Sequence, residues 1–199
     1  MLAARLLGIP FAVISLSLVL AIQAVFFGDG GISTLGANII NMSIAGVVLG
    51  ALIDRVLKKL KSNDKLSLSI ASWFSVMLAT TMCSLELAIV NQGQAVNIFK
   101  SMLGVHAFIG LGEALLTVGL VTLISHQRIN QFTYRIYAFA FIATLLSPLA
   151  SPFPDGLEWV ATKMSLQVFK VHSLVGLFPD YTVTGIPSEA LSTILAGIA

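Results

Sequence analysis

Charged side chains are scarce in this sequence. Asp, Glu, Lys and Arg together make up 10% of the 199 residues, whereas 57% are hydrophobic. Because a soluble domain carries about 25% charged residues, most of this protein must be solvated by lipid. The formal net charge of +2 gives no general attraction to nucleic acid, so nucleic acid is not expected as a partner.

Several long stretches contain no charge at all. They are residues 6–28, 30–53, 66–85 and 136–154, and residues 101–127 contain a single charge, Glu113. A spanning helix needs about 20 mostly apolar residues, whereas the strands of a β-barrel are about half as long and alternate apolar with polar side chains. The sequence therefore predicts an all-α, polytopic transmembrane helix bundle with five full spans. The apolar tail at residues 188–199 is too short to cross and is expected to form a partial sixth span.

Cysteine and catalytic motifs are also nearly absent. The single cysteine, Cys83, lies within a predicted span, which excludes an intrachain disulfide and favours a role as a small buried apolar residue. The sequence has no GxSxG, HExxH or Walker A pattern; these are the marks of common hydrolases and nucleotide-binding proteins. We therefore expect no enzymatic activity, and active transport would need a partner that hydrolyses ATP.

Basic residues are distributed unevenly between the connections. Eight of the eleven fall on one side if the spans alternate: Arg5, Arg55, Lys58, Lys59, Lys61, Lys65, Arg128 and Arg135. The positive-inside rule then predicts a multi-pass protein of the cell membrane with a cytoplasmic N-terminus, and with residues 28–31, 91–100 and 151–185 outside. A topology anchor is the simplest role for the basic run at residues 55–65, and a binding patch for anionic lipid or nucleic acid is the alternative.

The fourth predicted span carries the candidate metal-handling residues. His106, Gly110, Glu113 and Thr117 are spaced to share one helical face. An intramembrane carboxylate must face the protein interior or be neutralised, so we expect His106 near the outer end and Glu113 deeper, both facing the bundle. They would serve as a metal relay or coordination shell, or as a hydrogen-bonded network joining helices. One histidine and one carboxylate are too few donors for a divalent site. Three further titratable residues are interpreted as structural or solvated: Glu86, His126 and His172.

The segment GDGGISTLGANIINM, residues 28–42, joins the first two predicted spans. Its glycines at positions 28, 30 and 31 permit positive φ angles, so a tight turn at the membrane boundary is expected. Asp29 can accept backbone N–H groups or cap the next helix, as Asn38 also can. The alternative is that Asp29 forms part of the wall of an outward-facing metal site.

The chain divides near residue 150. Residues 1–148 are predicted to form the transmembrane core, with short connections between helices. Residues 149–199 form a second domain that contains SPFPDGLEWV, residues 151–160, and a polar segment too long for a simple turn.

The sequence resembles the CbiM/NikM family. The resemblance rests on three motifs in this order: GDGGISTLGANIINM, GVHAFIGLGEALLT (residues 104–117) and SPFPDGLEWV. Members of the family are the substrate-binding membrane components of energy-coupling-factor transporters for cobalt and nickel. The third motif resembles the start of a fused PDGLE domain, which is similar to CbiN/NikN. The resemblance implies that Ni²⁺ or Co²⁺ is the transported substrate, for cobalamin synthesis or nickel enzymes, with no permanently bound cofactor. It also implies two kinds of partner, a transmembrane coupling subunit and ATP-binding cassette ATPases.

The main metal ligands of that family do not map onto this sequence. In the family they are the initiator amine, a histidine at the second position and a histidine in a GTSGHLLG-like turn, whereas here Leu2 follows Met1 and the first histidine is His106. The resemblance therefore implies a family member without its first spans, in which His106, Glu113 and Asp29 would orient ligands or relay metal. Two hypotheses follow: a nickel or cobalt importer component, or a truncated, non-transporting structural or regulatory remnant that docks to such a transporter.

The predicted orientation can be tested with cysteine labelling. A cysteine at Ser62 should resist an impermeant thiol reagent in intact cells, because residues 54–65 are expected in the cytoplasm. A cysteine at Ser173 should react, because the second domain is expected outside. The reverse pattern would overturn the orientation.

Overall fold

The structure is a computed structural model that describes residues 1–125, 156–166, 177–178 and 181–198. Every regular element in these residues is helical. The α-helices are α1 (Leu2–Leu7), α2 (Ile9–Ile22), α3 (Leu35–Asn38), α4 (Val47–Lys59), α5 (Asp64–Val90), α6 (Ala95–Ser125), α8 (Gly156–Lys163) and α9 (Glu189–Ile198). Two π-helical segments, η1 (Gln23–Phe27) and η3 (Ile39–Gly46), and two 3₁₀ turns, η2 (Ile32–Thr34) and η4 (Gln92–Gln94), connect or extend them.

Four continuous helical stretches in the described residues are long and apolar enough to cross a membrane. They are Ile9–Phe27, Ile32–Lys59, Asp64–Val90 and Gln92–Ile124. They match the first four predicted spans, and the chain is a multi-pass membrane protein. The predicted fifth span, residues 136–154, lies outside the described residues. The tail forms only the ten-residue helix α9.

Helix α6 begins earlier in the sequence than the charge-free stretch predicted. An external connection was expected over residues 91–100, but α6 begins at Ala95 and includes Lys100. The apolar pattern explains this correction, because Ile98 and Met102 are fully buried and continue the helix outward beyond the charge. A single exposed lysine near a helix end does not stop a helix, since its long side chain can reach the interface.

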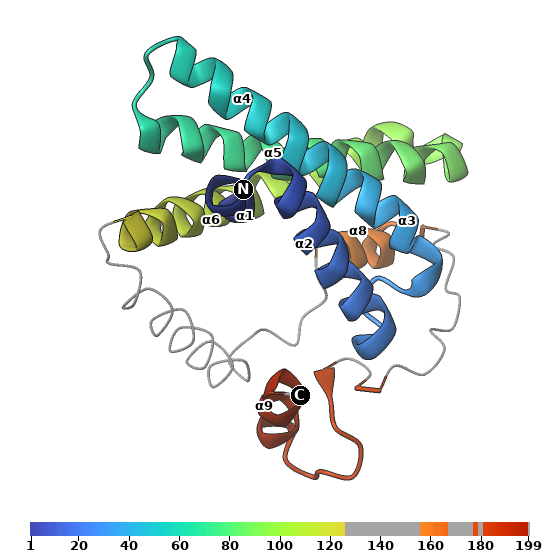
Figure 1. The fold of residues 1–199 in the computed structure, drawn as a ribbon. Coiled ribbons are helices and arrows are strands. Elements are labelled where there is room, and N and C mark those ends of the chain that lie inside the picture. The colour runs from blue at the N-terminus through green and yellow to red at the C-terminus, as the bar shows by residue number, and fades with distance from the viewer. Residues whose placement is uncertain (126–155, 167–176, 179–180, 199) are drawn as a thin grey trace.

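Helices α5 and α6 form the central antiparallel pair (Figure 1). Trp73 of α5 joins them, because its indole Nε1 donates a hydrogen bond to the Ala107 carbonyl oxygen over 3.0 Å. Gly110 lies against the same ring, and a Cβ there would be 3.0 Å from Trp73 Cδ1. A small residue at a helix contact lets the backbones approach closely, so Gly110 makes room for the tryptophan.

Helices η3 and α4 pack along one side of α5, and α2 packs on η3 and α4; hydroxyl groups join several of these helices. Ser75 of α5 donates to the Gly46 carbonyl oxygen over 2.8 Å. Ser43 of η3 donates to the Val13 carbonyl over 2.8 Å and lies 2.9 Å from the Ser17 hydroxyl. Interhelical hydrogen bonds of this kind stabilise membrane bundles by roughly 0.6 kcal/mol each.

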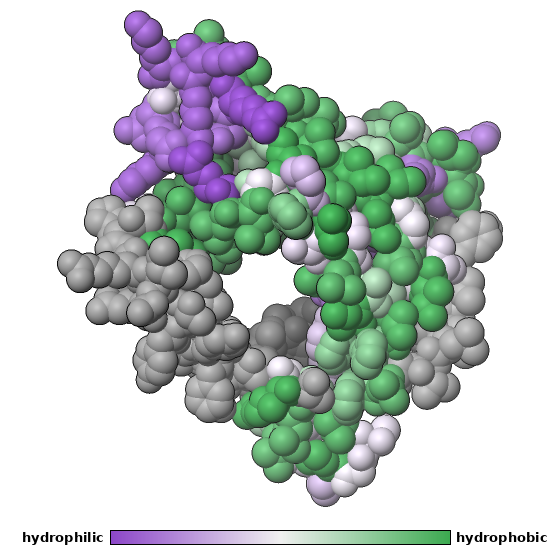
Figure 2. Space-filling view, in the orientation of Figure 1, coloured by the Kyte–Doolittle hydropathy of each residue, from purple (hydrophilic) through white to green (hydrophobic). Residues whose placement is uncertain are grey.

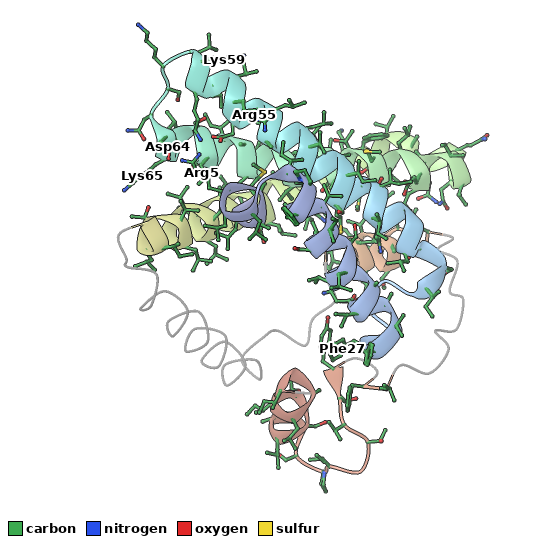
Figure 3. All side chains as sticks on the ribbon, in the orientation of Figure 1. Arg5, Phe27, Arg55, Lys59, Asp64 and Lys65 are labelled. Carbon is green, nitrogen blue, oxygen red and sulfur yellow. The ribbon has the colours of Figure 1, made fainter. Side chains whose placement is uncertain are left out.

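An ion-pair network closes the end of the molecule where α4 turns into α5 (Figure 3). Arg5 Nη2 contacts both carboxylate oxygens of Asp64 at 2.8 Å. Lys58 Nζ lies 2.6 Å from Asp54 Oδ2 and 3.0 Å from Asp64 Oδ1. Asp54 is buried and also accepts a hydrogen bond from the Ser67 hydroxyl over 2.9 Å. The network therefore ties α1 to both α4 and α5.

Candidate functional site

The GDGG segment forms the predicted tight turn. Gly28, Gly30 and Gly31 have φ angles of 71°, 70° and 72°, a region that side chains disfavour. Gly28 ends η1 in the left-handed conformation, and a Cβ at Gly30 would lie 2.8 Å from Asn38 Nδ2. The expected reversal of the chain at this point is confirmed.

Asp29 holds the C-terminal part of the chain to this turn. Its carboxylate accepts a hydrogen bond from the Tyr181 hydroxyl over 2.9 Å and lies 3.5 Å from Gln23 Nε2. The Phe27 ring stacks on Tyr181 with centroids 4.5 Å apart (Phe27 is labelled in Figure 3). The Phe178 backbone N–H donates to the Phe26 carbonyl oxygen over 2.8 Å. The turn, Phe178 and Tyr181 therefore form one contact, which we name the GDGG–Tyr181 junction.

The expected capping roles of Asp29 and Asn38 are wrong. The residue that precedes α3 is Thr34, without a side-chain capping bond, and Asn38 lies at the far end of that helix. Thr34 instead donates its hydroxyl to the Gly30 carbonyl. The positive φ angles carry the chain past Asp29 before the helix starts, which leaves the carboxylate free for Tyr181.

Sequence reasoning did not find Tyr181. Burial raises the pKa of its phenol above the ordinary tyrosine value, the hydrogen bond from Gln23 lowers that pKa, and Asp29 raises it. The neutral phenol is therefore the form that makes the contact. No local signal marked it, because residues 151–185 contain other aromatic residues, among them Trp159 and Phe178.

His106 lies under the start of the PDGLE motif's helix. The side chain is half-buried, and its Nδ1 donates to the Met102 carbonyl oxygen over 2.9 Å. Gly156, the first residue of α8, covers the opposite edge of the ring. A Cβ at Gly156 would lie 2.9 Å from His106 Cε1 and 3.2 Å from Nε2. We name this contact the His106–Gly156 junction.

An apolar cluster surrounds the His106–Gly156 junction. Val160 of α8 and Leu166 are buried against Ile98 and Met102 of α6. Burial of a side chain of this size stabilises a contact by about 1.5–3 kcal/mol where water is excluded. The helix that follows Gly156 is therefore anchored on α6 at the level of His106.

Glu113 does not share the environment of His106. It is exposed, so the described residues do not enclose it as expected. The charge of Glu113 acts on the α-amine of Met1: burial lowers the pKa of that amine, and the carboxylate raises it to a smaller extent.

A second polar pair, which sequence reasoning did not assemble, joins η3 to α5. Asn41 is buried, and its Nδ2 lies 3.1 Å from each carboxylate oxygen of Glu86. The Asn41 Oδ1 has no hydrogen-bond partner among the residues that the structure describes. This arrangement agrees with the structural interpretation of Glu86. Asn41 stands in the GDGGISTLGANIINM motif and in a π-helix, a geometry frequent at functional sites.

The three candidates do not form one metal site. Asp29 lies at the GDGG–Tyr181 junction, His106 against α8, and Glu113 beside Met1. No group of three or more His, Cys, Asp or Glu side chains within the described part of the chain could hold a metal ion. His126 and His172 lie outside the described residues. The structure therefore shows two contacts between the core and the C-terminal part in place of a complete coordination shell.

Comparison with known proteins identifies the family of this chain. The sequence model of CbiM, the cobalt uptake substrate-specific transmembrane region, matches residues 1–131. The chain belongs to the CbiM family. The model of the PDGLE domain matches residues 131–199, so in this CbiM-family protein both junctions join the CbiM region to the PDGLE domain. No solved structure matches the chain.

Several curated relatives carry transport names. A protein of Archaeoglobus fulgidus assigned as a fused nickel transport protein NikMN is 32% identical over 99% of this chain and 70% of its own length. The cobalt transport protein CbiM of Acetoanaerobium sticklandii is 32% identical over 55% of this chain and 47% of its own length. The fused nickel transport protein NikMN of Rhodobacter capsulatus is 51% identical over 26% of this chain and 15% of its own length. The chain thus spans about half the length of that CbiM relative.

The His106–Gly156 junction can be tested by adding one methyl group. Gly156→Ala should lower stability by about 1–3 kcal/mol, because the new Cβ overlaps the imidazole ring. Gly93→Ala is the matched control, since nothing lies within 4 Å of a Cβ there. In the double variant Gly156→Ala/His106→Ala the cost of the alanine should largely disappear. Thermal unfolding of the purified proteins measures these differences, and equal effects of the two glycine substitutions would contradict the contact.

The GDGG–Tyr181 junction can be tested through one backbone amide. Tyr181→Phe keeps the ring stack but removes a hydrogen bond of about 1 kcal/mol, so hydrogen exchange at the Phe178 amide should become about fivefold faster. Asp29→Ala should have a similar effect, and the double variant should add little, because both remove the bond between the phenol and the carboxylate. Fully additive effects would show that the two side chains act separately.

Proposed function

We propose that this protein is a membrane component of an importer for Ni²⁺ or Co²⁺. The observation that carries the proposal is that a CbiM region and a PDGLE domain occupy one chain and meet at two motif residues, Asp29 and His106. The partners in this proposal are a transmembrane coupling subunit and ATP-binding cassette ATPases, because nothing in the sequence matches a nucleotide-binding motif. The protein itself has no enzymatic role in this scheme.

The two domains divide at residues 148 and 149 in this proposal. The GDGG–Tyr181 junction places Tyr181 at the same end of the bundle as the turn. The basic connection between α4 and α5 lies at the opposite end of α4 from that turn. By the positive-inside rule, the basic end is cytoplasmic and the PDGLE domain lies outside. Metal arriving from outside would therefore meet the PDGLE domain first.

Substrate metal would pass near His106. Imidazole nitrogen suits Ni²⁺, and His106 is the one histidine within the described residues. Gly156 covers its Nε2 edge, while Nδ1 is held by the Met102 carbonyl. A metal-ligating histidine commonly donates its other ring nitrogen to a backbone carbonyl in this way, which fixes the ring orientation. In this scheme, movement of α8 exposes or covers Nε2.

A non-transporting docking protein is the second candidate. The observation that favours it is the absence, in the described residues, of any group of three or more metal-ligating acidic, histidine or cysteine side chains. In that case the two junctions would serve only to hold the PDGLE domain in place. Both candidates predict association with the coupling subunit, and only the first predicts metal uptake.

Coexpression with a coupling subunit and ATPases of a CbiM-type transporter separates the two candidates. We expect ATP-dependent accumulation of radioactive Ni²⁺ or Co²⁺ above that of the partners alone. His106→Ala should reduce uptake by about tenfold or more, as loss of a metal-handling group does, whereas Lys100→Gln, an exposed substitution on the same helix, should not. Complex formation without uptake would support the docking protein. Failure to associate would overturn both candidates.

A further inference from the structure

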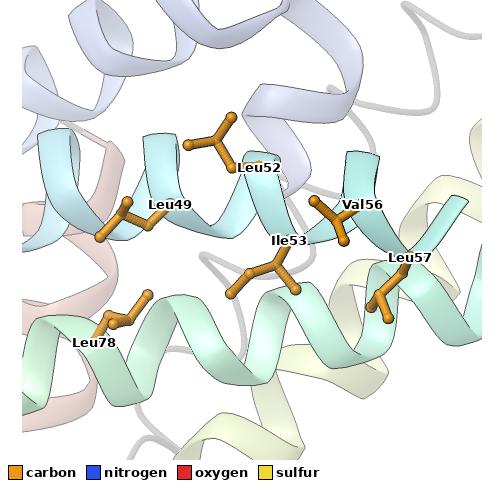
Figure 4. A pocket seen from close by; sticks show the side chains of 6 residues that line it. All are labelled: Leu49, Leu52, Ile53, Val56, Leu57 and Leu78. Carbon is orange, nitrogen blue, oxygen red and sulfur yellow. The ribbon is translucent and has the colours of Figure 1, made fainter. Parts of the chain in front are cut away.

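An apolar groove runs along the outer surface between α4 and α5 (Figure 4). It has a volume of about 380 Å³, and its six lining side chains are all aliphatic: Leu49, Leu52, Ile53, Val56, Leu57 and Leu78. Leu52 and Val56 are 44% and 55% exposed. The groove is therefore open on the side of α4 that faces away from the bundle. Its size falls in the range of ligand pockets, about 300–1,000 Å³.

Four exposed cations gather at one end of this groove. They are Arg55, Lys59, Lys61 and Lys65, which we name the basic end; hydrophilic surface is concentrated there in Figure 2. The neighbouring acidic residues, Asp54 and Asp64, are already paired with Arg5 and Lys58. Because two acids and two bases cancel in that network, the four residues of the basic end leave about four positive charges uncompensated at neutral pH.

The groove and the basic end are in register along α4. Lys59 follows Val56 by three residues and Leu52 by seven, so all three lie on one stripe of the helix. Arg55 lies on the other side of that stripe from the groove, where it lines a second hollow with Arg5 and Asp54. Leu49 and Leu57 are separated by about 12 Å along the axis at 1.5 Å per residue. Along α4 in Figure 3, Lys59 and Arg55 lie apart from Lys65, which is beside Asp64 and Arg5.

We propose that this surface binds one anionic phospholipid, with an acyl chain in the groove and the headgroup phosphate against Lys59. The charge favours an anionic headgroup over a zwitterionic one, because each cation near a membrane surface strengthens the attraction to anionic lipid. Free phosphate would make no use of the groove. The groove offers no hydrogen-bonding side chain or aromatic pocket, which a protein partner would need for orientation. The site lies in the leaflet that contacts the α4–α5 connection and is independent of the proposed function.

Native mass spectrometry of the purified full chain tests the proposal. Phosphatidylglycerol should bind about tenfold or more tightly than phosphatidylcholine with the same acyl chains. Lys59→Gln should weaken phosphatidylglycerol binding by about fivefold, since one cation near the membrane surface contributes about 1 kcal/mol. The matched control is Arg55→Gln, which removes the same charge from the same helix on the side away from the groove and should change binding by less than about twofold.

A second pair of variants tests the role of the groove itself. Leu52→Trp should fill the groove and reduce binding of both lipids, whereas Leu115→Trp, on an exposed position of α6, should leave it unchanged. Inorganic phosphate should not compete at concentrations that saturate the lipid. Equal affinity for the two lipids, equal effects of Lys59→Gln and Arg55→Gln, or competition by inorganic phosphate would each overturn the proposal. So would a complex with the coupling subunit in which that subunit fills the groove.

Discussion

The cost of leaving a polar group unpaired in hydrocarbon governs how this chain packs. Lipid offers no hydrogen bonds, so each polar side chain within a span must find its partner inside the protein. The indole of Trp73 bonds to the Ala107 carbonyl, the Ser75 hydroxyl bonds to the Gly46 carbonyl, and Ser43 bonds to the Val13 carbonyl. Each of these bonds crosses from one helix to another. The few polar residues therefore set the register in which the apolar surfaces meet.

The two ends of the bundle are closed by different chemistry. At the α4–α5 end, the Arg5–Asp64 pair is exposed and the Lys58–Asp54 pair is partly buried. A single exposed pair stabilises by at most about 1 kcal/mol, and a connected network does better. At the opposite end, an aromatic stack and the Tyr181–Asp29 bond hold the PDGLE domain. The ion pairs at the α4–α5 end involve residues close in sequence to the spans. The Tyr181–Asp29 bond at the opposite end joins residues 152 positions apart, so it depends on how the whole chain folds.

Much of the fold could be predicted from the sequence because a spanning helix leaves a local signal. Charge-free stretches gave four helices that the structure describes, and the glycines of GDGG predicted the turn. Contacts between distant segments leave no such signal. Nothing local distinguishes Tyr181 as the partner of Asp29, or Asn41 as the partner of Glu86. Glu113 shows the limit most clearly: helical spacing put it on the face of His106, yet it is exposed beside Met1, because α8 covers only the part of that face around His106.

Helix α8 packs over His106 and covers one side of its ring. The imidazole is held from one side by its own helix through the Met102 carbonyl and closed on the other by Gly156. A glycine at that position places backbone against the ring, where any side chain would displace it. Removal of α8 would therefore uncover Nε2 without disturbing the bond that orients the ring. The histidine is thus preorganised by the CbiM region, and its accessibility is set by the PDGLE domain. The GDGG–Tyr181 junction is a second attachment of that domain to the CbiM region, through a hydrogen bond and an aromatic stack.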